Sequence, residues 1–303
     1  MCGIVGQLNF DNNPVSPVIL KRMTDVLSHR GPDGEGHWIE ENIGLGHRRL
    51  SIIDLSPAGH QPMVSADQRF ILSYNGEIYN FQELRTELEA KGHHFRSNSD
   101  SEVVLHSLSE WGSDAMLRFN GMFALALWDR KLKRLLLARD RYGIKPLYYF
   151  IDNKKFVLEK KKKAILEQPA FDKKINKKAL LEYFTFQNIF TDQTLLQGIK
   201  LLKPGHYGII DVRKSGDEMH QTQYWDYHFR EPEKKVPKEE YLEELERLFK
   251  QAVKRQLVSD VELGSYLSGG MDSGSITSIA STTFPYLKTF TCGFDLSSAS
   301  GIE

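Results

Sequence analysis

Met1-Cys2-Gly3-Ile4-Val5-Gly6-Gln7-Leu8 opens the chain and places a cysteine directly after the initiator methionine. A small second residue allows Met1 to be removed, which leaves Cys2 with a free α-amino group. That amine has a reference pKa of about 8, so part of it is an uncharged base near neutral pH. One residue can then supply both the attacking thiolate and the general base. From these residues alone, Cys2 could equally be a small apolar residue that begins a strand.

The composition is typical of a folded globular protein, since 40% of the 303 residues are apolar and 26% are charged. Lys plus Arg number 40 and balance 40 Asp plus Glu, so the charge does not favour nucleic acid or an anionic membrane as partner. The sequence lacks a long apolar run, which excludes a transmembrane helix, and the absence of a basic n-region at the N-terminus argues against a secretory signal. Two cysteines, Cys2 and Cys292, exclude a disulfide scaffold and predict a cytoplasmic protein.

The first 150 residues predict a mixed sandwich of sheets and helices. Two helices are expected, Phe81–Lys91 with Asn80 as its cap, and Ser101–Glu110. Apolar runs predict strands at Gly3–Leu8, Arg69–Tyr74, Phe123–Trp128 and Arg134–Arg139. The turn signals between them are Asp33-Gly34, Asn75-Gly76, Asn120-Gly121 and Tyr142-Gly143.

The second half is more polar before it becomes regular again. The run Glu159-Lys160-Lys161-Lys162-Lys163 is expected to be exposed, and Arg230–Lys238 is interpreted as a linker. An amphipathic helix is predicted from Glu239 onward. A strand at Val261–Leu267, a helix at Ser275–Ser281 and a strand at Lys288–Phe294 then predict one βαβ unit. Because a single βαβ unit cannot cover both faces of a parallel sheet, we expect the chain to be a fragment of a longer protein.

Further motifs follow Cys2 in a fixed order. They are Arg30-Gly31-Pro32-Asp33, Gly46-His47-Arg48-Arg49-Leu50-Ser51-Ile52, Gln61-Pro62-Met63, Tyr74-Asn75-Gly76-Glu77-Ile78-Tyr79-Asn80 and Ser99-Asp100-Ser101-Glu102-Val103. With these motifs the sequence resembles the class II glutamine amidotransferases of the N-terminal-nucleophile hydrolase type. Within that group it is similar to the glutamine-hydrolysing asparagine synthetase family, and the resemblance covers essentially the whole chain.

The resemblance implies a glutamine site. In it Cys2 would attack the side-chain amide, while the Asn75 side chain and the Gly76 N–H would form the oxyanion hole. Arg49 would bind the substrate α-carboxylate, with backbone contacts from the stretch that it begins, and Glu77 and Asp100 would hold the α-ammonium group. The remaining residues of that stretch are Leu50, Ser51, Ile52 and Ile53. His47 is interpreted as structural, Arg30 and Asp33 as ordering a lid, and Arg139–Tyr149 as structural support.

A second site is predicted where the βαβ unit turns from strand to helix. Leu267-Ser268-Gly269-Gly270-Met271-Asp272-Ser273 resembles the SGGxDS pyrophosphate loop of ATP pyrophosphatases. Glycines allow the backbone to approach phosphate oxygens, and the serines and the helix N-terminus add donors. Asp272 could assist Mg²⁺ or order the loop. By the resemblance, Tyr266, Leu267 and Cys292-Gly293 would border the adenine, and Cys292 is otherwise expected to be a buried thiol.

The expected fold is α+β, an αββα sandwich followed by the beginning of an α/β Rossmann-like adenine-nucleotide α-hydrolase domain. The expected domains are an amidotransferase domain at 2–200, a connector at 201–238 and the start of a synthetase domain at 239–303. No resident metal site is expected; ATP and Mg²⁺ are the expected cofactors. The implied partners are glutamine, ATP and aspartate or another carboxylate acceptor, with a homodimer as a further expectation.

The implied reaction couples glutamine hydrolysis to amidation of an aspartyl-adenylate, with AMP and pyrophosphate as products. Three alternatives remain open at this point: amidation of another carboxylate such as a sugar acid, glutaminase activity only, or noncatalytic glutamine binding. The segment after Phe156 departs from the family pattern, which resembles Ala-Ser-Glu-x-Lys-Ala-Leu. This chain has Glu159 followed by four lysines in that region, which is expected near the domain interface.

Overall fold

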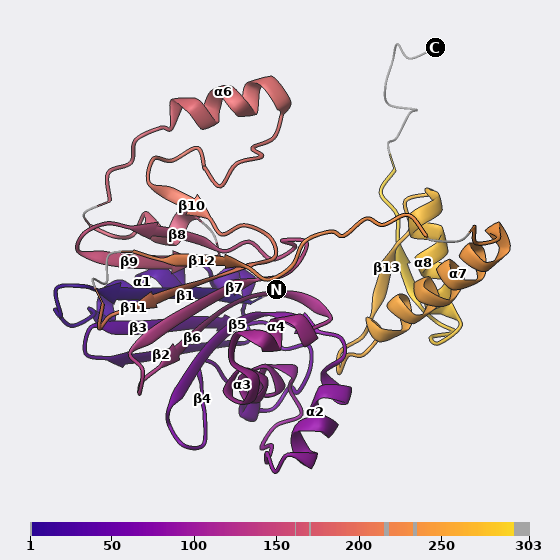
Figure 1. Ribbon diagram of the computed structural model, residues 1–303, viewed down its shortest axis with the longest axis horizontal. Helices are drawn as coiled ribbons and strands as arrows, with labels where there is room; N and C mark the ends of the chain where they lie inside the picture. The colour runs from indigo at the N-terminus through magenta and orange to yellow at the C-terminus, as the bar shows by residue number, and fades with distance from the viewer. Residues whose placement is uncertain (1, 161, 170, 215–217, 233–234, 294–303) are drawn as a thin grey trace. The chain divides into compact units, whose positions relative to one another are not determined.

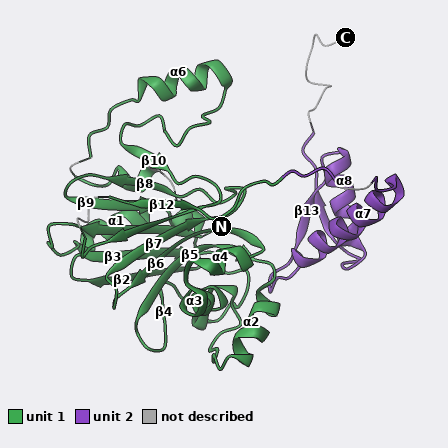
Figure 2. Cartoon of the chain, viewed as in Figure 1, with its two compact units in different colours: residues 1–228 green, residues 229–303 purple. Residues whose placement is uncertain are grey.

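The protein is described by a computed structural model that covers residues 2–160, 162–169, 171–214, 218–232 and 235–293. The chain divides into two compact units, residues 1–228 and residues 229–303 (Figure 2). Within the described residues, no helix is both long and apolar enough to cross a membrane.

The first unit contains two six-stranded sheets, and all the strand pairs within them are antiparallel. The order in one sheet is β10 (Ile199–Leu201), β8 (Tyr148–Ile151), β9 (Lys155–Glu159), β1 (Gly3–Asn9), β3 (Ile43–Arg49) and β2 (Gly34–Glu40). The order in the other is β12 (His220–Gln223), β11 (His206–Asp211), β7 (Arg134–Arg139), β6 (Gly121–Asp129), β5 (Phe70–Ile78) and β4 (Met63–Val64).

Helices cover the outer faces of both sheets (Figure 1). The β1 sheet packs against α1 (Pro17–Asp25) and α5 (Lys162–Ile165), and the β5 sheet packs against α2 (Phe81–Ala90), α3 (Asp100–Trp111) and α4 (Ala115–Arg118). A third apolar cluster lies between the sheets. The unit is therefore a four-layer αββα sandwich, as expected. Outside these layers are α6 (Lys177–Phe186) and the short 3₁₀ helices η1 (Ser28–Arg30), η2 (Pro57–Gly59) and η3 (Gly112–Asp114).

The alternation of side chains along β6 explains why the layers form. Phe123, Leu125 and Leu127 pack toward the helices, whereas the intervening Ala124, Ala126 and Trp128 pack toward the other sheet. Successive strand residues point to opposite faces, so a strand that is apolar at every position needs cover on both sides. The continuous apolar run in this strand therefore dictates a buried position between two layers.

The second unit is small and contains one βαβ element. Its described elements are α7 (Lys238–Arg255), followed by the βαβ element of β13 (Gly264–Tyr266), α8 (Met271–Ser281) and β14 (Lys288–Phe290). The strands β13 and β14 are parallel, with Gly264 opposite Lys288. This confirms the predicted βαβ unit, although both strands are shorter and the helix starts earlier than expected. The end of the second predicted strand, Phe294, lies outside the described residues.

One expected turn is instead part of a strand. Asn75-Gly76 lies inside β5, where Gly76 pairs with Phe123 of β6. A Cβ atom at Gly76 would overlap the carbonyl oxygen of Met122, so this glycine permits close strand packing rather than a reversal of the chain. The Asn-Gly prediction was wrong because the same dipeptide also suits a site of close backbone approach.

Other sequence expectations are corrected in the same way. Glu159 and Lys160 are buried, 0% and 2% exposed, because β9 lies in the interior of a sheet, between β8 and β1. Asn80 does stand at the start of α2, but its side chain bonds Arg118 and Asn120 rather than capping the helix. Cys292 is exposed, since it follows the end of β14. The strands β11 and β12, inside the stretch expected as a connector, belong to the sheets of the first unit.

Candidate functional site

A cavity of about 150 Å³ lies in the first unit at the start of β1. It brings together residues that are far apart in the sequence and that come from the chain terminus, the loop after β3, β5 and the N-terminus of α3. Its walls are formed by Cys2, Arg49, Leu50, Ile52, Ile53, Gln61, Tyr74, Asn75, Gly76, Glu77, Ser99, Asp100, Ser101, Met122 and Lys145.

Cys2 is partly buried and immediately precedes β1, whose residues are all buried. Its Sγ atom lies 3.4 Å from the Leu50 backbone nitrogen, which donates to it, and 3.6 Å from the Leu50 carbonyl oxygen. Burial raises the pKa of the Cys2 thiol, outweighing the opposing effects of the Leu50 N–H and of the Lys160 charge. A nucleophilic Cys2 would therefore need a base close by, and its own α-amino group is the nearest one that chemistry offers.

Asn75 and Gly76 form a rigid part of the wall because they lie within the β5–β6 pair. Asn75 is 1% exposed, and its Oδ1 atom accepts a hydrogen bond of 3.3 Å from Lys160 Nζ. Its Nδ2 atom is buried and has no hydrogen-bond partner among the described residues. A buried donor without a partner is costly, so this amide is suited to a ligand atom in the cavity.

In the loop that follows β3, backbone carbonyl groups fix the side chain of Arg49. Arg49 Nη1 donates to the Ser56 carbonyl oxygen at 2.8 Å, and Nη2 donates to the Asp54 carbonyl oxygen. The Ser51 N–H donates to Asp33 Oδ2 at 2.8 Å, a contact that ties the Arg-Gly-Pro-Asp motif to this loop. Of the five consecutive residues expected to contact the substrate, Arg49, Leu50, Ile52 and Ile53 line the cavity.

Two carboxyl groups, of Glu77 and Asp100, face the same cavity. Burial raises the pKa of Asp100 to about 6, although the Ile78 N–H at 3.1 Å and the Tyr74 hydroxyl at 2.9 Å favour its charged form. Burial also raises the pKa of Glu77, with the Lys145 charge opposing the rise. A bound cation would lower the cost of ionising these groups, so the pair suits an ammonium group.

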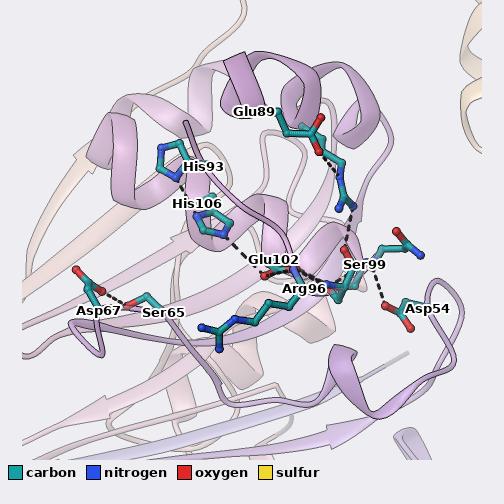
Figure 3. Close-up of polar contacts among 12 residues, drawn as sticks. Asp54, Ser65, Asp67, Glu89, His93, Arg96, Ser99, Glu102 and His106 are labelled. Carbon is teal, nitrogen blue, oxygen red and sulfur yellow. Dashed lines mark hydrogen bonds and ion pairs between the residues drawn. The ribbon is translucent and has the colours of Figure 1, made fainter. Parts of the chain in front are cut away.

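Asp100 is positioned by the start of α3. Ser99 caps this helix by accepting from the Glu102 N–H at 3.4 Å, and Glu102 in turn accepts from the Arg96 and Ser97 N–H groups (Figure 3). Burial opposes ionisation of Glu102, but hydrogen bonds from His106, Ser97 and the backbone lower its pKa to about 2. A charged Glu102 thus fixes the loop that carries Asp100 into the cavity.

Sequence reasoning missed two lysines of this region. Lys145 is 3% exposed and lines the cavity, although its segment was interpreted only as structural support. The turn around it is indeed structural, since the Asp140 carboxylate accepts from the backbone of Ile144 and Lys145. No local sequence pattern shows that this lysine is buried, so the sequence offered no signal that marks it as a site residue. Lys160, the second lysine, was assigned to an exposed run.

His47, interpreted from the sequence as structural, is a buried residue of β3. It is 1% exposed, and its Nε2 atom lies 3.0 Å from the Tyr74 carbonyl oxygen. Burial lowers the pKa of His47 to about 3, so the ring is neutral at ordinary pH. It is not part of the cavity wall.

The glycine-serine loop of the second unit connects β13 to α8. Gly269 has a φ of +82°, a conformation that favours glycine. Ser268 Oγ and Ser273 Oγ lie 3.0 Å apart, and the N-cap residue of α8, Gly270, has no side chain with which to cap the first turn. Hydroxyls, unencumbered glycines and uncapped N–H groups together fit a phosphate group. Tyr266 and Leu267 precede this loop, and Asp272 lies in the first turn of the helix.

Within the described ranges, no group of three or more His, Cys, Asp or Glu side chains could hold a metal ion. Mg²⁺ is commonly bound by one or two carboxylates together with substrate phosphates rather than by a protein cage. Asp272 fits that kind of site, because it is the acidic residue of the helix turn that follows the loop.

Comparison with known proteins agrees with this geometry. Residues 1–225 match the family model described as a glutamine amidotransferase domain. The chain belongs to the glutamine amidotransferase domain family. Residues 244–301 of this amidotransferase match a second family model, described as asparagine synthase.

Curated relatives are named glutamine-hydrolysing asparagine synthetases. The amidotransferase is 39% identical over 289 residues to asparagine synthetase [glutamine-hydrolyzing] 3 of Bacillus subtilis strain 168, covering 94% of this chain and 46% of that protein. It is 36% identical to asparagine synthetase [glutamine-hydrolyzing] 1 of the same organism, covering 100% of this chain and 47% of that protein. The chain therefore spans about half the length of these relatives.

A solved structure supports the fold. A glutamine phosphoribosylpyrophosphate amidotransferase from B. subtilis matches with a TM-score of 0.54 and 16% identity, covering 100% of this chain and 71% of that one. At this identity the likeness concerns the fold alone. The αββα sandwich is thus the α+β fold of the class II, N-terminal-nucleophile amidotransferases, as the sequence predicted.

Proposed function

We propose that this chain hydrolyses glutamine at Cys2 and that the ammonia serves an ATP-dependent amidation by the whole protein. The observation that carries the proposal is the meeting of Cys2 Sγ, two carboxyl groups and Asn75 Nδ2, which lacks a partner in the described part of the chain, around one cavity. Nucleophile, oxyanion donor and ammonium acceptors are the parts that amide hydrolysis of an amino-acid substrate requires.

In the proposed mechanism, the α-amine of the mature Cys2 takes the thiol proton while Sγ attacks the glutamine side-chain carbonyl carbon. Negative charge develops on the carbonyl oxygen, where Asn75 Nδ2 and the Gly76 N–H would stabilise it. The proton then passes to the leaving nitrogen, and ammonia departs from a glutamyl thioester. Water hydrolyses the thioester, so that glutamine and water give glutamate and ammonia.

Substrate binding would use the rest of the cavity wall. Arg49 would bind the α-carboxylate, for which a planar guanidinium is suited, and Glu77 and Asp100 would accept from the α-ammonium. The backbone of Leu50 through Ile53 would complete the contacts. Ser51 would act in this stretch through the Asp33 contact that anchors the loop.

In the whole protein, we propose that ATP activates the β-carboxylate of aspartate as an acyl-adenylate and releases pyrophosphate. Ammonia would then displace AMP and give asparagine. Ser268, Gly269, Gly270 and Ser273 would contact the phosphates, and Asp272 would help to hold Mg²⁺. Tyr266, Leu267 and Cys292 would border the adenine. The supporting observations are the phosphate-compatible loop and the match of residues 244–301 to asparagine synthase.

The test of the first step is glutamate release from glutamine by this chain, by a Cys2→Ala variant and by a Cys292→Ala control. The parent and the control should release glutamate at equal rates, while C2A should lose activity by about 10⁴-fold or more, as for other lost nucleophiles. Activity retained by C2A would refute the proposal. Binding of glutamine without turnover would favour a noncatalytic role, and AMP formation assayed with aspartate and with sugar acids would identify the acceptor.

A further inference from the structure

A buried lysine lies against the candidate site and has no role in the mechanism above. Lys160 is 2% exposed and directly follows β9. Its Nζ atom donates to the Cys2 carbonyl oxygen at 2.7 Å and to Asn75 Oδ1 at 3.3 Å. Its backbone N–H donates to the Ile4 carbonyl oxygen at 3.2 Å, which fixes the lysine to β1.

Burial of an ammonium group costs several kcal/mol unless strong hydrogen bonds compensate. Lysine side chains usually extend their charge to water, and this one instead directs it toward two residues of one site. The two acceptors belong to the proposed nucleophile and to the proposed oxyanion donor. These contacts indicate a role for Lys160 in the site, which a solvated surface lysine would not have.

The contact with Asn75 has a geometric consequence. An ammonium group only donates hydrogen bonds, so it can pair with the oxygen of an amide but not with its nitrogen. With Oδ1 bound to Lys160, the Nδ2 atom is directed to the other side of the amide, where it is buried and without a partner among the described residues. The lysine thereby selects one of the two orientations of the Asn75 amide.

We propose that Lys160 is a positioning residue for glutamine hydrolysis, which fixes the Asn75 amide with Nδ2 available to the oxyanion and holds the Cys2 backbone beside it. This inference rests on the proposed glutaminase function.

The first experiment compares steady-state glutamate release by Lys160→Met and by Lys155→Met. Lys155 is a matched control, because it lies on β9 and bonds Gln168 instead of the site. We expect K160M to lower kcat by about 10- to 100-fold, less than the loss of the oxyanion donor itself, with KM changed by less than about 2-fold. K155M should keep the parental kcat. A folded K160M enzyme with parental kcat, or with only KM raised, would overturn the inference.

A double-mutant cycle tests whether the lysine acts through Asn75. In an Asn75→Ala background, K160M should reduce kcat by less than about 2-fold, since the group that it positions is gone. A full additional loss in that background would overturn the inference. If K160M fails to fold, Lys160→Gln replaces it, because an amide can pair with either end of the Asn75 amide and so no longer selects one orientation. K160Q should lower kcat by about 3-fold or more, and parental kcat in K160Q would contradict the proposal.

Nuclear magnetic resonance separates failure of this inference from failure of the proposed function. The side-chain amide protons of Asn75, identified by their disappearance in N75A, should exchange with solvent at least about 10-fold faster in K160M or K160Q than in the parent. This readout needs no turnover. A parent that releases no glutamate would refute the proposed function, whereas an unchanged exchange rate would refute the role of Lys160.

Discussion

The cavity at Cys2 and the loop Ser268–Ser273 both present polar groups to a ligand, but one is enclosed and the other is open. Asn75 and Asp100 are 1% and 6% exposed, whereas Met271 within the loop and Tyr266 shortly before it are each 84% exposed. In the cavity, the Asn75 donor is left without a partner, while the loop serines bond one another. This difference indicates that the cavity at Cys2 is organised before its ligand arrives. The loop, in contrast, must exchange its internal hydrogen bonds for contacts with phosphate.

The largest expected effect concerns the prearranged donor. Asn75→Ala should lower kcat for glutamate release by about 10²–10³-fold and leave KM nearly unchanged, because the lost bond forms fully only in the transition state. Steady-state kinetics measure both constants. If kcat/KM fell by the same factor only because KM rose, Asn75 would act in ground-state binding. The contrast between a prearranged first site and an open second site would then be weaker.

The open loop should respond to a different ligand. Ser273→Ala removes a hydroxyl that bonds Ser268 and the Gly270 carbonyl oxygen. Loss of a hydrogen bond to a charged phosphate should weaken ATP binding by about 10-fold or more. Glutamate release should be unchanged, and N75A should show the reverse pattern. Calorimetry with ATP measures the loss of ATP affinity. A fall of glutaminase activity in S273A would contradict the independence of the two sites.

Replacement of a glycine by alanine should change the free energy of unfolding in opposite directions in the two regions. Gly76→Ala forces a Cβ atom against Met122 and Phe123 and should lower the free energy of unfolding by about 1–3 kcal/mol. Gly274 lies inside α8 with no atom within 4 Å of an added Cβ, so Gly274→Ala should stabilise the helix by up to about 1 kcal/mol. Denaturant unfolding followed by circular dichroism tests this, and equal effects at both glycines would contradict the packing described.

The smallest effect is a pH dependence of glutamine binding. The pKa of Asp100 is raised to about 6, so the carboxyl group is charged above that pH and gains a proton as the pH falls through it. Because the proposed role needs the charged form, glutamine affinity should fall by up to about tenfold for each pH unit below 6. Calorimetry with the C2A variant measures binding without turnover. A constant affinity between pH 5 and pH 7 would remove Asp100 from ammonium binding.

Much of the fold and of the site follows from local patterns and ordered motifs. Apolar strands and helical patterns predicted the layered sandwich, and the motifs around Asn75 and Asp100 predicted residues that do line one cavity. The expectation that the run Glu159–Lys163 is exposed failed at Glu159 and Lys160, although Lys163 is exposed, because charge alone does not show that β9 lies inside a sheet. Lys160 and Lys145 could not be placed, since their role depends on contacts with distant residues, which no local pattern reports.

The two cysteines show the same limit of prediction from sequence. Cys292 was expected to be a buried apolar thiol, but its exposure depends on where β14 ends. Cys2 and Cys292 therefore form an internal comparison, with the same chemical group in an enclosed site and in an open one. Burial raises the pKa of the Cys2 thiol, so a small general alkylating reagent should react first with the exposed Cys292.

The most direct measurement of the central claim is mass spectrometry of the chain after treatment with a diazo-ketone analogue of glutamine, compared with iodoacetamide. The predicted result is a reversed order: iodoacetamide labels Cys292 before Cys2, whereas the glutamine analogue labels Cys2 alone, on a chain that has lost Met1. Labelling of Cys292 by the analogue, or an unlabelled Cys2 on the chain without Met1, would contradict a glutamine-directed nucleophile at this site.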